Sequence, residues 1–549
     1  WQGCSSEREA YARALPAAQP GQVLVQEDKD KRAAWRLPES LYLRWMAVLL
    51  VADPVHWTHV DCTVGEVRKA FRLLHWGLMP ARLRYMALPS RWARFGLNYM
   101  YMNLKAKCFS DGVGRVCAKP GHSCLRKVVS WRAHPAVDYY RWLARAVQTL
   151  VKSWGRAYEV ASLKTAAAEL RRKVALLEGT EDDLCKRCGA CMPTPSVLVA
   201  DAAQMYEEVP PTRVVQGLSS LVDWASSQGY TGVVVSKRRG GASHLARQGW
   251  RHPPGTEAFS WDELVTGIRL ALAQGAVAVG DSVWRQAEGL PIGGPHSPAC
   301  CSVVLGADEA AWTADPARRA RHGFSPRGRD LSSQVAYARY VDDLCMVSRK
   351  WCKSCLEAML GVMYTKPVQF DRQDSSSHGQ PWLDLWIAFH DGEMRIHMDG
   401  QEQAWFDAMG ACPPSKLRLK PYLEDERGSY EALRTHVSAR LARLRQAGLD
   451  QEAMKAAVER ELLVLSYHGY PRKRLMQAWS RCCQFPEASR HARLVLAAWE
   501  MALPGLTRLQ PDWTWATPVR ARWEHEQGSP GCCAAGGWSP GTGQGVRTA

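Results

Sequence analysis

The sequence lacks an apolar run long enough to cross a bilayer, for which a helix needs roughly 20 apolar residues. The longest candidate extends only from Trp45 to Ala52. A cleavable signal and internal repeats are also absent from these residues. We therefore expect no membrane partner. Position 1 is Trp, so we expect the chain to be a fragment.

Acidic residues are scarce relative to basic ones. Asp and Glu number 54 against 71 Lys and Arg, which gives 549 residues a formal net charge of +17. Such a surplus is typical of proteins that bind polyanions, because neutralised phosphates release their counterions. Charge alone does not separate nucleic acid from anionic lipid. A composition of 46% hydrophobic and 23% charged residues indicates a globular chain of roughly two to four domains, or one multi-lobed enzyme.

Cysteine is plentiful, with 18 residues and no secretory signal. This favours reduced thiols and an intracellular location, with the nucleus as one option. Two groups could bind Zn²⁺. The first is Cys108, Cys117, His122 and Cys124, whose spacing matches no common zinc finger and fits scattered thiols equally well. The second is Cys185, Cys188 and Cys191, which would need a fourth ligand, could join the first group, or could be core thiols.

Two adjacent acids stand at the centre of the chain, in Tyr340-Val341-Asp342-Asp343. Short β-prone runs, 334–339 and 344–348, flank them and predict a hairpin with the acids at its tip. Neighbouring carboxylates between apolar runs are costly to desolvate unless a cation neutralises them. Taken alone, this stretch fits a solvated surface turn as well.

Two upstream stretches change that interpretation. Residues 197–206 place Asp201 directly after an apolar run, and residues 286–298 read QAEGLPIGGPHSP. In this order, the three stretches resemble motifs A, B and C of reverse transcriptases. The middle one fits the pattern Q-x2-G-x-P-x-G-x3-S-P at every fixed position, and the last fits Y-x-D-D. The resemblance covers roughly 183–470 and implies a retroelement-derived or domesticated protein.

The resemblance implies an α+β right-hand polymerase with an antiparallel palm sheet, helical fingers and a helical thumb. The expected organisation is a loose lead-in over 1–36, an N-terminal helical and Cys-His region with the fingers over 37–182, a palm over 183–400, a helical thumb over 401–510 and a disordered tail over 511–549. On the thumb, Arg434, Arg440, Arg443 and Arg445 are expected to grip the duplex backbone.

The resemblance also implies the site. Asp201, Asp342 and Asp343 would be catalytic and hold two Mg²⁺ ions, with an RNA template, a DNA primer and dNTPs as partners. The residues implied to bind substrate are Tyr206, Gln286, Gly289, Pro291, Gly293, Ser297, Tyr340 and Lys366. Tyr206 would pack beneath the sugar of the incoming nucleotide, although a tyrosine there can also be ordinary core. Ser297 with Pro298 is expected to cap the helix that follows.

Hydrophobic periodicity predicts helices over 64–74, 160–177, 261–275 and 351–363, and a second hairpin that joins 382–389 to 394–398. The chain departs from the family in its long spacing between motifs A and B, and in an arginine-rich insertion over 318–329 before motif C. The basic fingers motifs cannot be placed. Two alternatives stay open: an RNA-dependent RNA polymerase, and a catalytically degenerate RNA-binding protein with zinc modules.

Overall fold

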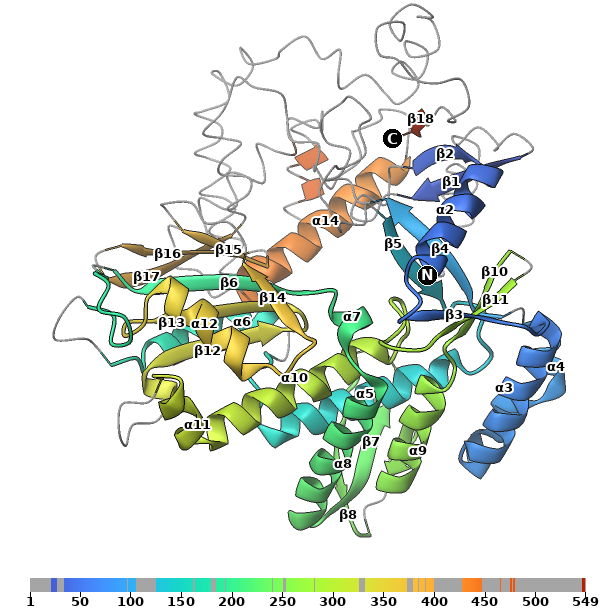
Figure 1. The fold of residues 1–549 in the computed structure, drawn as a ribbon, viewed down its shortest axis with the longest axis horizontal. Coiled ribbons are helices and arrows are strands. Elements are labelled where there is room, and N and C mark those ends of the chain that lie inside the picture. The colour runs from blue at the N-terminus through green and yellow to red at the C-terminus, as the bar shows by residue number, and fades with distance from the viewer. Residues whose placement is uncertain are drawn as a thin grey trace, which may run out of the picture.

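The computed structural model combines helices with mostly antiparallel sheets, which confirms the α+β class (Figure 1). The residues that it describes are 21–26, 34–95, 97–104, 125–160, 163–178, 184–192, 194–238, 240–249, 253–280, 282–324, 331–372, 379–383, 385–390, 392–398, 427–446, 465, 474–475, 477–478 and 546–548. Among these residues, no helix has both the length and the apolar character needed to cross a bilayer.

A four-stranded antiparallel sheet lies at the left of Figure 1, in the order β12-β13-β6-β14. Its strands are β6 (Ser196–Ala203), β12 (Val335–Tyr340), β13 (Asp343–Ser348) and β14 (Gln369–Arg372). β12 and β13 form the predicted hairpin, with Val341 and Asp342 as its turn. We call this sheet the acidic sheet, because Asp201, Asp343 and Asp371 lie across it.

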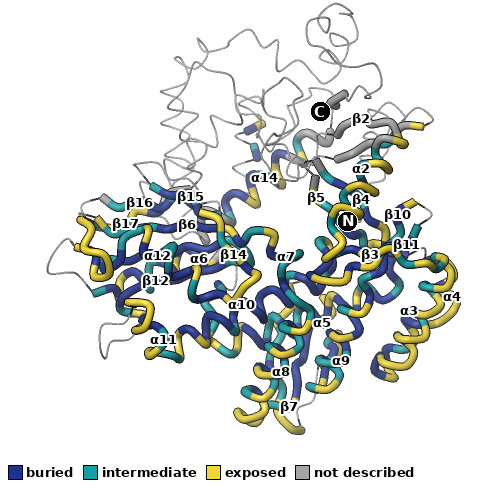
Figure 2. Tube along the Cα trace, in the orientation of Figure 1, coloured by how far each residue is buried: buried dark blue, intermediate teal, exposed yellow. Residues whose placement is uncertain are grey.

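Both faces of the acidic sheet are covered, which explains the apolar runs in its strands (Figure 2). Leu198 and Leu344 point into one core with α10 (Ser297–Ala314) and α12 (Lys353–Met363). Val199 and Cys345 point into a second core, since side chains alternate across a strand. That second core also receives side chains from α6 (Leu163–Val174), β15 (Gln380–Trp382), β16 (Leu385–His390), β17 (Glu393–Met398) and α14 (Arg427–Gln446).

A five-stranded sheet lies on the side of Figure 1 opposite the acidic sheet, with its strands in the order β3-β11-β10-β4-β5. Its strands are β3 (Trp57–Val60), β4 (Tyr99–Leu104), β5 (Leu125–Ser130), β10 (Ala276–Val279) and β11 (Ser282–Gln286). The surrounding helices are α2 (Glu39–Val51), α3 (Val64–Leu78), η1 (Ala81–Ala87), α4 (Pro89–Trp92) and α5 (Val137–Trp154). α5 is strongly buried and packs along α10 (Figure 1).

The long segment between motifs A and B folds into structure of its own. A three-stranded sheet, β8-β7-β9, packs with two long helices against α5. These elements are α7 (Met205–Glu208), α8 (Pro211–Ser227), β7 (Tyr230–Ser236), β8 (His244–Arg247), β9 (Thr256–Ser260) and α9 (Trp261–Leu272). Before motif C come α11 (Pro316–Arg321) and η3 (Leu331–Ser333).

The predicted helices are confirmed within a few residues. They correspond to α3, α6, α9 and α12, and the second predicted hairpin corresponds to β16 and β17. α9 begins where a capping box of Ser260 and Glu263 satisfies its first backbone donors.

Two expectations change at the ends of the chain. Residues 22–26 and 34–38 pair as strands β1 and β2, so the loose lead-in is wrong for the residues described there. Val23 and Val25 in the first segment and Trp35 in the second are residue types enriched in strands. β18 (Val546–Thr548) pairs with β2, so the tail is not disordered at these three positions. Of the expected thumb, the structure describes α14 and residues 465, 474, 475, 477 and 478.

Candidate active site

Asp201 and Asp343 lie opposite each other on neighbouring strands. Asp201 is near the end of β6, Asp343 is the first residue of β13, and their Cα atoms are register partners. Paired residues project their side chains from the same face of a sheet. Asp342 immediately precedes β13, and its backbone carbonyl accepts a 3.1 Å hydrogen bond from the N–H of Ala202. The fold therefore brings together the three acids that come from two distant stretches of sequence.

A fourth acid joins this arrangement. Asp371 on β14 is the register partner of Asp201 on its other side, so Asp343, Asp201 and Asp371 form a row across three strands. Like charges directly opposite each other destabilise a sheet. A cation placed between these carboxylates would relieve the repulsion. Sequence reasoning missed Asp371, because it lies in no motif and only strand pairing places it beside Asp201.

The turn that carries Asp342 is conformationally strained. Val341 has a φ of +58°, a left-handed conformation that a β-branched residue rarely adopts. Such a residue costs on the order of 1–3 kcal/mol and persists only where the surroundings enforce it. Here the Nη1 of Arg339 donates a 2.7 Å hydrogen bond to the carbonyl of Val341. Arg339 thus holds the turn in the shape that presents Asp342.

Arg339 is itself fixed by a fully buried ion pair. Its Nε lies 2.5 Å from Oε1 of Glu309 on α10, and its Nη2 lies 3.3 Å from Oε2. The same carboxylate accepts hydrogen bonds of 2.8 Å from the N–H of Tyr158 and the hydroxyl of Tyr364. Burial disfavours the charged guanidinium, but Glu309 outweighs this effect and raises the pKa of Arg339. The network joins α10 to the acidic turn.

The motif B loop is fastened to the segment that follows Asp201. Gly289 has a φ of +78°, and a Cβ there would lie 2.4 Å from the carbonyl oxygen of Glu207 on α7. The N–H of Leu290 donates a 2.5 Å hydrogen bond to the carbonyl of Tyr206. Only glycine permits this approach of two backbones. Motifs A and B therefore meet directly.

Tyr206 lies at this junction, partly buried against the core that contains α10 and α12. Burial raises the pKa of its hydroxyl, and Coulombic interactions with Cys301 and with the Asp342 carboxylate raise it further. The phenol consequently stays protonated and lies close enough to Asp342 to sense its charge.

The predicted capping role of Ser297 is wrong. α10 begins at Ser297, its N-cap is His296, and no side chain caps it. The Ser297 hydroxyl instead donates a 2.8 Å hydrogen bond to the carbonyl of Pro291, six residues earlier. This bond closes the motif B loop on itself, and Ser297 is already the first residue of the helix rather than its N-cap.

The same loop also rests on β5. The N–H of Val129 donates a 2.7 Å hydrogen bond to the carbonyl of Ile292. Gly293 has a φ of +100°, and a Cβ there would lie 2.5 Å from the Val129 carbonyl oxygen. The loop is thus held between the five-stranded sheet and the motif A segment.

The remaining residues implied to bind substrate occupy varied positions. Gln286 is buried at the end of β11, and its Oε1 has no hydrogen-bond partner among the described residues. Tyr340 is half-buried at the end of β12 and is the register partner of Asp343. Lys366 is exposed in the turn after α12. Their contacts with substrate stay predictions.

No protein family matches the chain, and no curated protein matches it. Among solved structures, it is similar to telomerase from Candida albicans in complex with a TWJ fragment of telomeric RNA, at 10% identity and a TM-score of 0.43, over 86% of this chain and 73% of that one. Apo telomerase from Candida tropicalis is 10% identical with a TM-score of 0.43, over 90% of this chain and 75% of that one. The RNA-dependent RNA polymerase 3Dpol of a sicinivirus is 9% identical with a TM-score of 0.28, over 53% of this chain and 52% of that one. Similarities this remote establish neither fold nor function.

The donor set of the acidic sheet fits Mg²⁺. Mg²⁺ prefers oxygen ligands and binds through a few carboxylates completed by water and substrate phosphates. Asp201, Asp342 and Asp343 offer only oxygen. Within the described chain, these three carboxylates do not converge to within 4.8 Å of one another, so they form no closed cage. Such an open arrangement leaves ligand positions for substrate.

One arginine in each of two basic stretches is buried. Arg440 on α14 is only 8% exposed and therefore cannot grip a duplex backbone, contrary to expectation. Its exposed neighbour Arg434 pairs with Glu431 at 2.8 Å, and the side chains of Arg443 and Arg445 lie outside the described residues. In the arginine-rich insertion, Arg319 is buried and donates to backbone carbonyls of Trp312 and Thr313.

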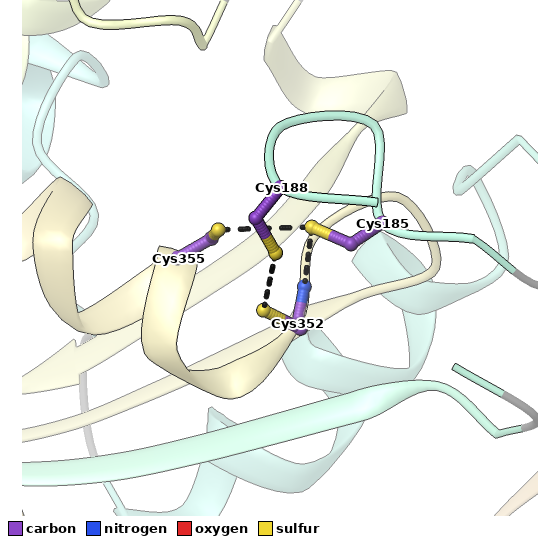
Figure 3. Close-up of side chains that lie close together, drawn as sticks. All are labelled: Cys185, Cys188, Cys352 and Cys355. Atoms are coloured by element: carbon purple, nitrogen blue, oxygen red, sulfur yellow. Dashed lines mark hydrogen bonds between the residues drawn. The ribbon is translucent and has the colours of Figure 1, made fainter. Parts of the chain in front are cut away.

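The second cysteine group has a different membership from the predicted one. Cys185 and Cys188 meet Cys352 and Cys355, and we call this set the four-cysteine cluster (Figure 3). Cys191 is exposed outside it, and its backbone bridges to Leu184 to close the loop. A second C-x2-C at 352–355 was the signal that sequence reasoning overlooked. The first predicted group, Cys108, Cys117, His122 and Cys124, lies outside the described residues.

Proposed function

We propose that the chain is a reverse transcriptase that synthesises DNA on an RNA template by nucleotidyl transfer. In this proposal, the acidic sheet is the palm, α14 belongs to the thumb, and residues 37–182 contribute the fingers. The observation that carries it is the register pairing of Asp201 with Asp343. Asp342 is adjacent to this pair, and the motif B loop is hydrogen-bonded to the segment that follows Asp201. The ordered motifs, together with acids brought onto paired strands, support a polymerase better than a structural turn.

The chain's own residues provide positioning and electrostatics. Bound by Asp201, Asp342 and Asp343, Mg²⁺ would supply the charge that activates the primer hydroxyl and neutralises the triphosphate. The Arg339–Glu309 pair holds the acidic turn rigid, so little reorganisation is needed during the reaction. A net charge of +17 favours the template, the primer and dNTPs as partners.

Tyr206 is the candidate determinant of sugar choice. It follows Asp201 by five residues, lies near Asp342 and is held by the Leu290 hydrogen bond. A ring in this place would collide with a 2′-hydroxyl and admit a deoxyribose. This role favours DNA over RNA as the product.

Primer extension tests the proposal. Wild-type protein is given a primed RNA template, Mg²⁺ and either dNTPs or ribonucleotides, alongside Asp201→Asn, Asp342→Asn and the control Asp223→Asn on an exposed position of α8. We expect dNTP addition by the wild type and the control, and none by the two site variants, which still bind primer–template. Wild-type protein that binds without extending would indicate the degenerate RNA-binding alternative. Preferred ribonucleotide addition would indicate an RNA polymerase.

A further inference from the structure

Four cysteines from two distant segments meet at the end of the acidic sheet where β6 begins and β13 ends. The loop that precedes β6 carries Cys185 and Cys188, and the start of α12, just after β13, carries the other two (Figure 3). All four sulfur atoms lie within 4.8 Å of one another. The Cys185 and Cys355 sulfurs are 3.6 Å apart, and those of Cys188 and Cys352 are 3.5 Å apart.

These separations suit a tetrahedral metal site better than disulfides. A tetrahedron with Zn–S bonds of about 2.3 Å has sulfur–sulfur edges of about 3.8 Å. A disulfide would need sulfurs about 2.05 Å apart. The measured distances of 3.5 and 3.6 Å are close to the tetrahedral edge.

The first arm has the backbone of a metal-binding loop. The N–H of Gly189 donates a 2.8 Å hydrogen bond to the carbonyl of Cys185, and Gly189 has a φ of +73°. The N–H of Cys185 donates at 2.8 Å to the carbonyl of Ala190. The left-handed glycine directly after the second cysteine turns the chain back, so that both sulfurs face the same point.

The second arm is a helix N-terminus. Cys352 is the N-cap of α12, and Cys355 lies in its first turn. Helix N-termini stabilise negative charge, and therefore favour thiolates over thiols. The N–H of Cys352 also donates a 3.3 Å hydrogen bond to the sulfur of Cys185, so the two arms contact each other directly.

A basic side chain lies beside the cluster. Four thiolates around one divalent cation would leave a net negative charge at the site. Arg187, whose Nη1 lies 3.7 Å from the Cys355 sulfur, would offset the remaining negative charge.

We propose that the four-cysteine cluster binds one zinc ion that ties the strand of Asp201 to the strand of Asp343. The proposal goes beyond polymerase activity and does not depend on it. A backbone hydrogen bond of 2.9 Å from Lys186 to Lys350 already joins the two arms. Next to the arms, Ser196 pairs with Ser348, and the Asp201–Asp343 pair lies five residues along β6, roughly 17 Å away at 3.3–3.4 Å per residue. Zinc would act as a positioning group that fixes the register of these strands.

Metal analysis of the purified full chain tests the proposal. One variant, Cys188→Ser, removes a proposed ligand at an exposed position. The control, Cys191→Ser, removes an exposed cysteine that lies three residues further along the chain and outside the cluster. We expect Cys188→Ser to lose about one zinc per chain relative to wild type, and Cys191→Ser to lose none. Cys188→His should regain the zinc, because histidine replaces cysteine in tetrahedral sites.

Measurements on the unmutated protein complete the test. Replacement of zinc by Co²⁺ should produce thiolate-to-cobalt charge-transfer absorption that disappears in Cys188→Ser and persists in Cys191→Ser. Chelation should lower the thermal unfolding temperature of wild type more than that of Cys188→Ser. Equal zinc content in wild type and Cys188→Ser, or iron in place of zinc, would overturn the proposal. Because these measurements use no nucleic acid or nucleotide, their outcome is separate from that of primer extension.

Discussion

Asp201 is paired on both sides with an acid: Asp343 is its register partner on β13, and Asp371 is its partner on β14. The two partners differ in what adjoins them. Asp343 is next to Asp342 in the strained turn, whereas Asp371 adjoins the exposed Arg372, which pairs with Glu357 at 2.9 Å. We infer that Asp371 tunes the charge around the site rather than holding a metal directly.

Asp371→Asn should therefore weaken Mg²⁺ dependence without abolishing synthesis. We expect an apparent Mg²⁺ affinity reduced roughly 10- to 100-fold, the range typical of groups that support metal ligands. Asp342→Asn should abolish synthesis at every Mg²⁺ concentration. Titration of Mg²⁺ in primer extension distinguishes the two variants. Complete inactivity of Asp371→Asn at high Mg²⁺ would indicate that Asp371 is itself a metal ligand.

Gly289→Ala should damage both stability and synthesis. The new Cβ would lie 2.4 Å from the Glu207 carbonyl in a left-handed backbone conformation, which alone costs roughly 1–2 kcal/mol. The motif B loop must then move away from Tyr206. Gly77→Ala is the control, since its Cβ meets nothing within 4 Å and lies in α3. Urea unfolding of both variants measures the difference, and equal stabilities would contradict the close approach.

Arg339→Met should be strongly destabilising, because it leaves the Glu309 carboxylate buried without its partner. Loss of one partner of a buried ion pair costs about 3–5 kcal/mol. Arg372→Met removes an exposed ion pair and should cost at most about 1 kcal/mol. Chemical denaturation of each variant provides the comparison. A small effect at Arg339 would mean that the network does not brace the acidic turn.

Tyr206→Val should admit ribonucleotides while largely preserving deoxynucleotide addition, because the ring that would meet the 2′-hydroxyl is gone. Tyr206→Phe keeps the ring and should remain selective. Steady-state incorporation of both nucleotide types by the three proteins measures the selectivity ratio. An unchanged selectivity ratio in Tyr206→Val would mean that Tyr206 is an ordinary core residue and does not select the sugar.

Acid should destabilise the fold through buried histidines. Burial lowers the pKa of His296 to about 4, and that of His75 to about 4, although the Phe71 carbonyl opposes the shift at His75. Their unfolded value is about 6.5, so the unfolded chain takes up protons first as pH falls. Their contribution is therefore intact above pH 6.5, declines as pH falls toward 4, and levels off below it. Each histidine accounts for roughly 3 kcal/mol of that loss.

His296→Phe should remove its share of this acid sensitivity. Neither ring nitrogen of His296 has a hydrogen-bond partner in the described chain, so the substitution deletes only the titrating group. Unfolding free energies measured between pH 7 and pH 4 test this, and parallel curves for wild type and His296→Phe would contradict it.

Local sequence was sufficient to predict the elements that carry the chemistry. The hairpin around Asp342 followed from two β-prone runs, and α9 from its apolar spacing and its Ser260–Glu263 cap. These features depend on residues within one turn or one strand of each other, so neighbours along the chain determine them. Motif order also indicated that Asp201 and Asp342 belong to one site.

Tertiary structure alone decided which distant residues meet. Strand register placed Asp371 beside Asp201, and the close ends of β6 and β13 brought Cys352 and Cys355 to Cys185 while leaving Cys191 outside. Packing turned Arg440 inward and directed the Ser297 hydroxyl to its loop instead of the helix. A one-residue shift in pairing would reverse the face of every side chain on a strand. Such pairings depend on contacts between segments far apart in the chain, which no local pattern specifies.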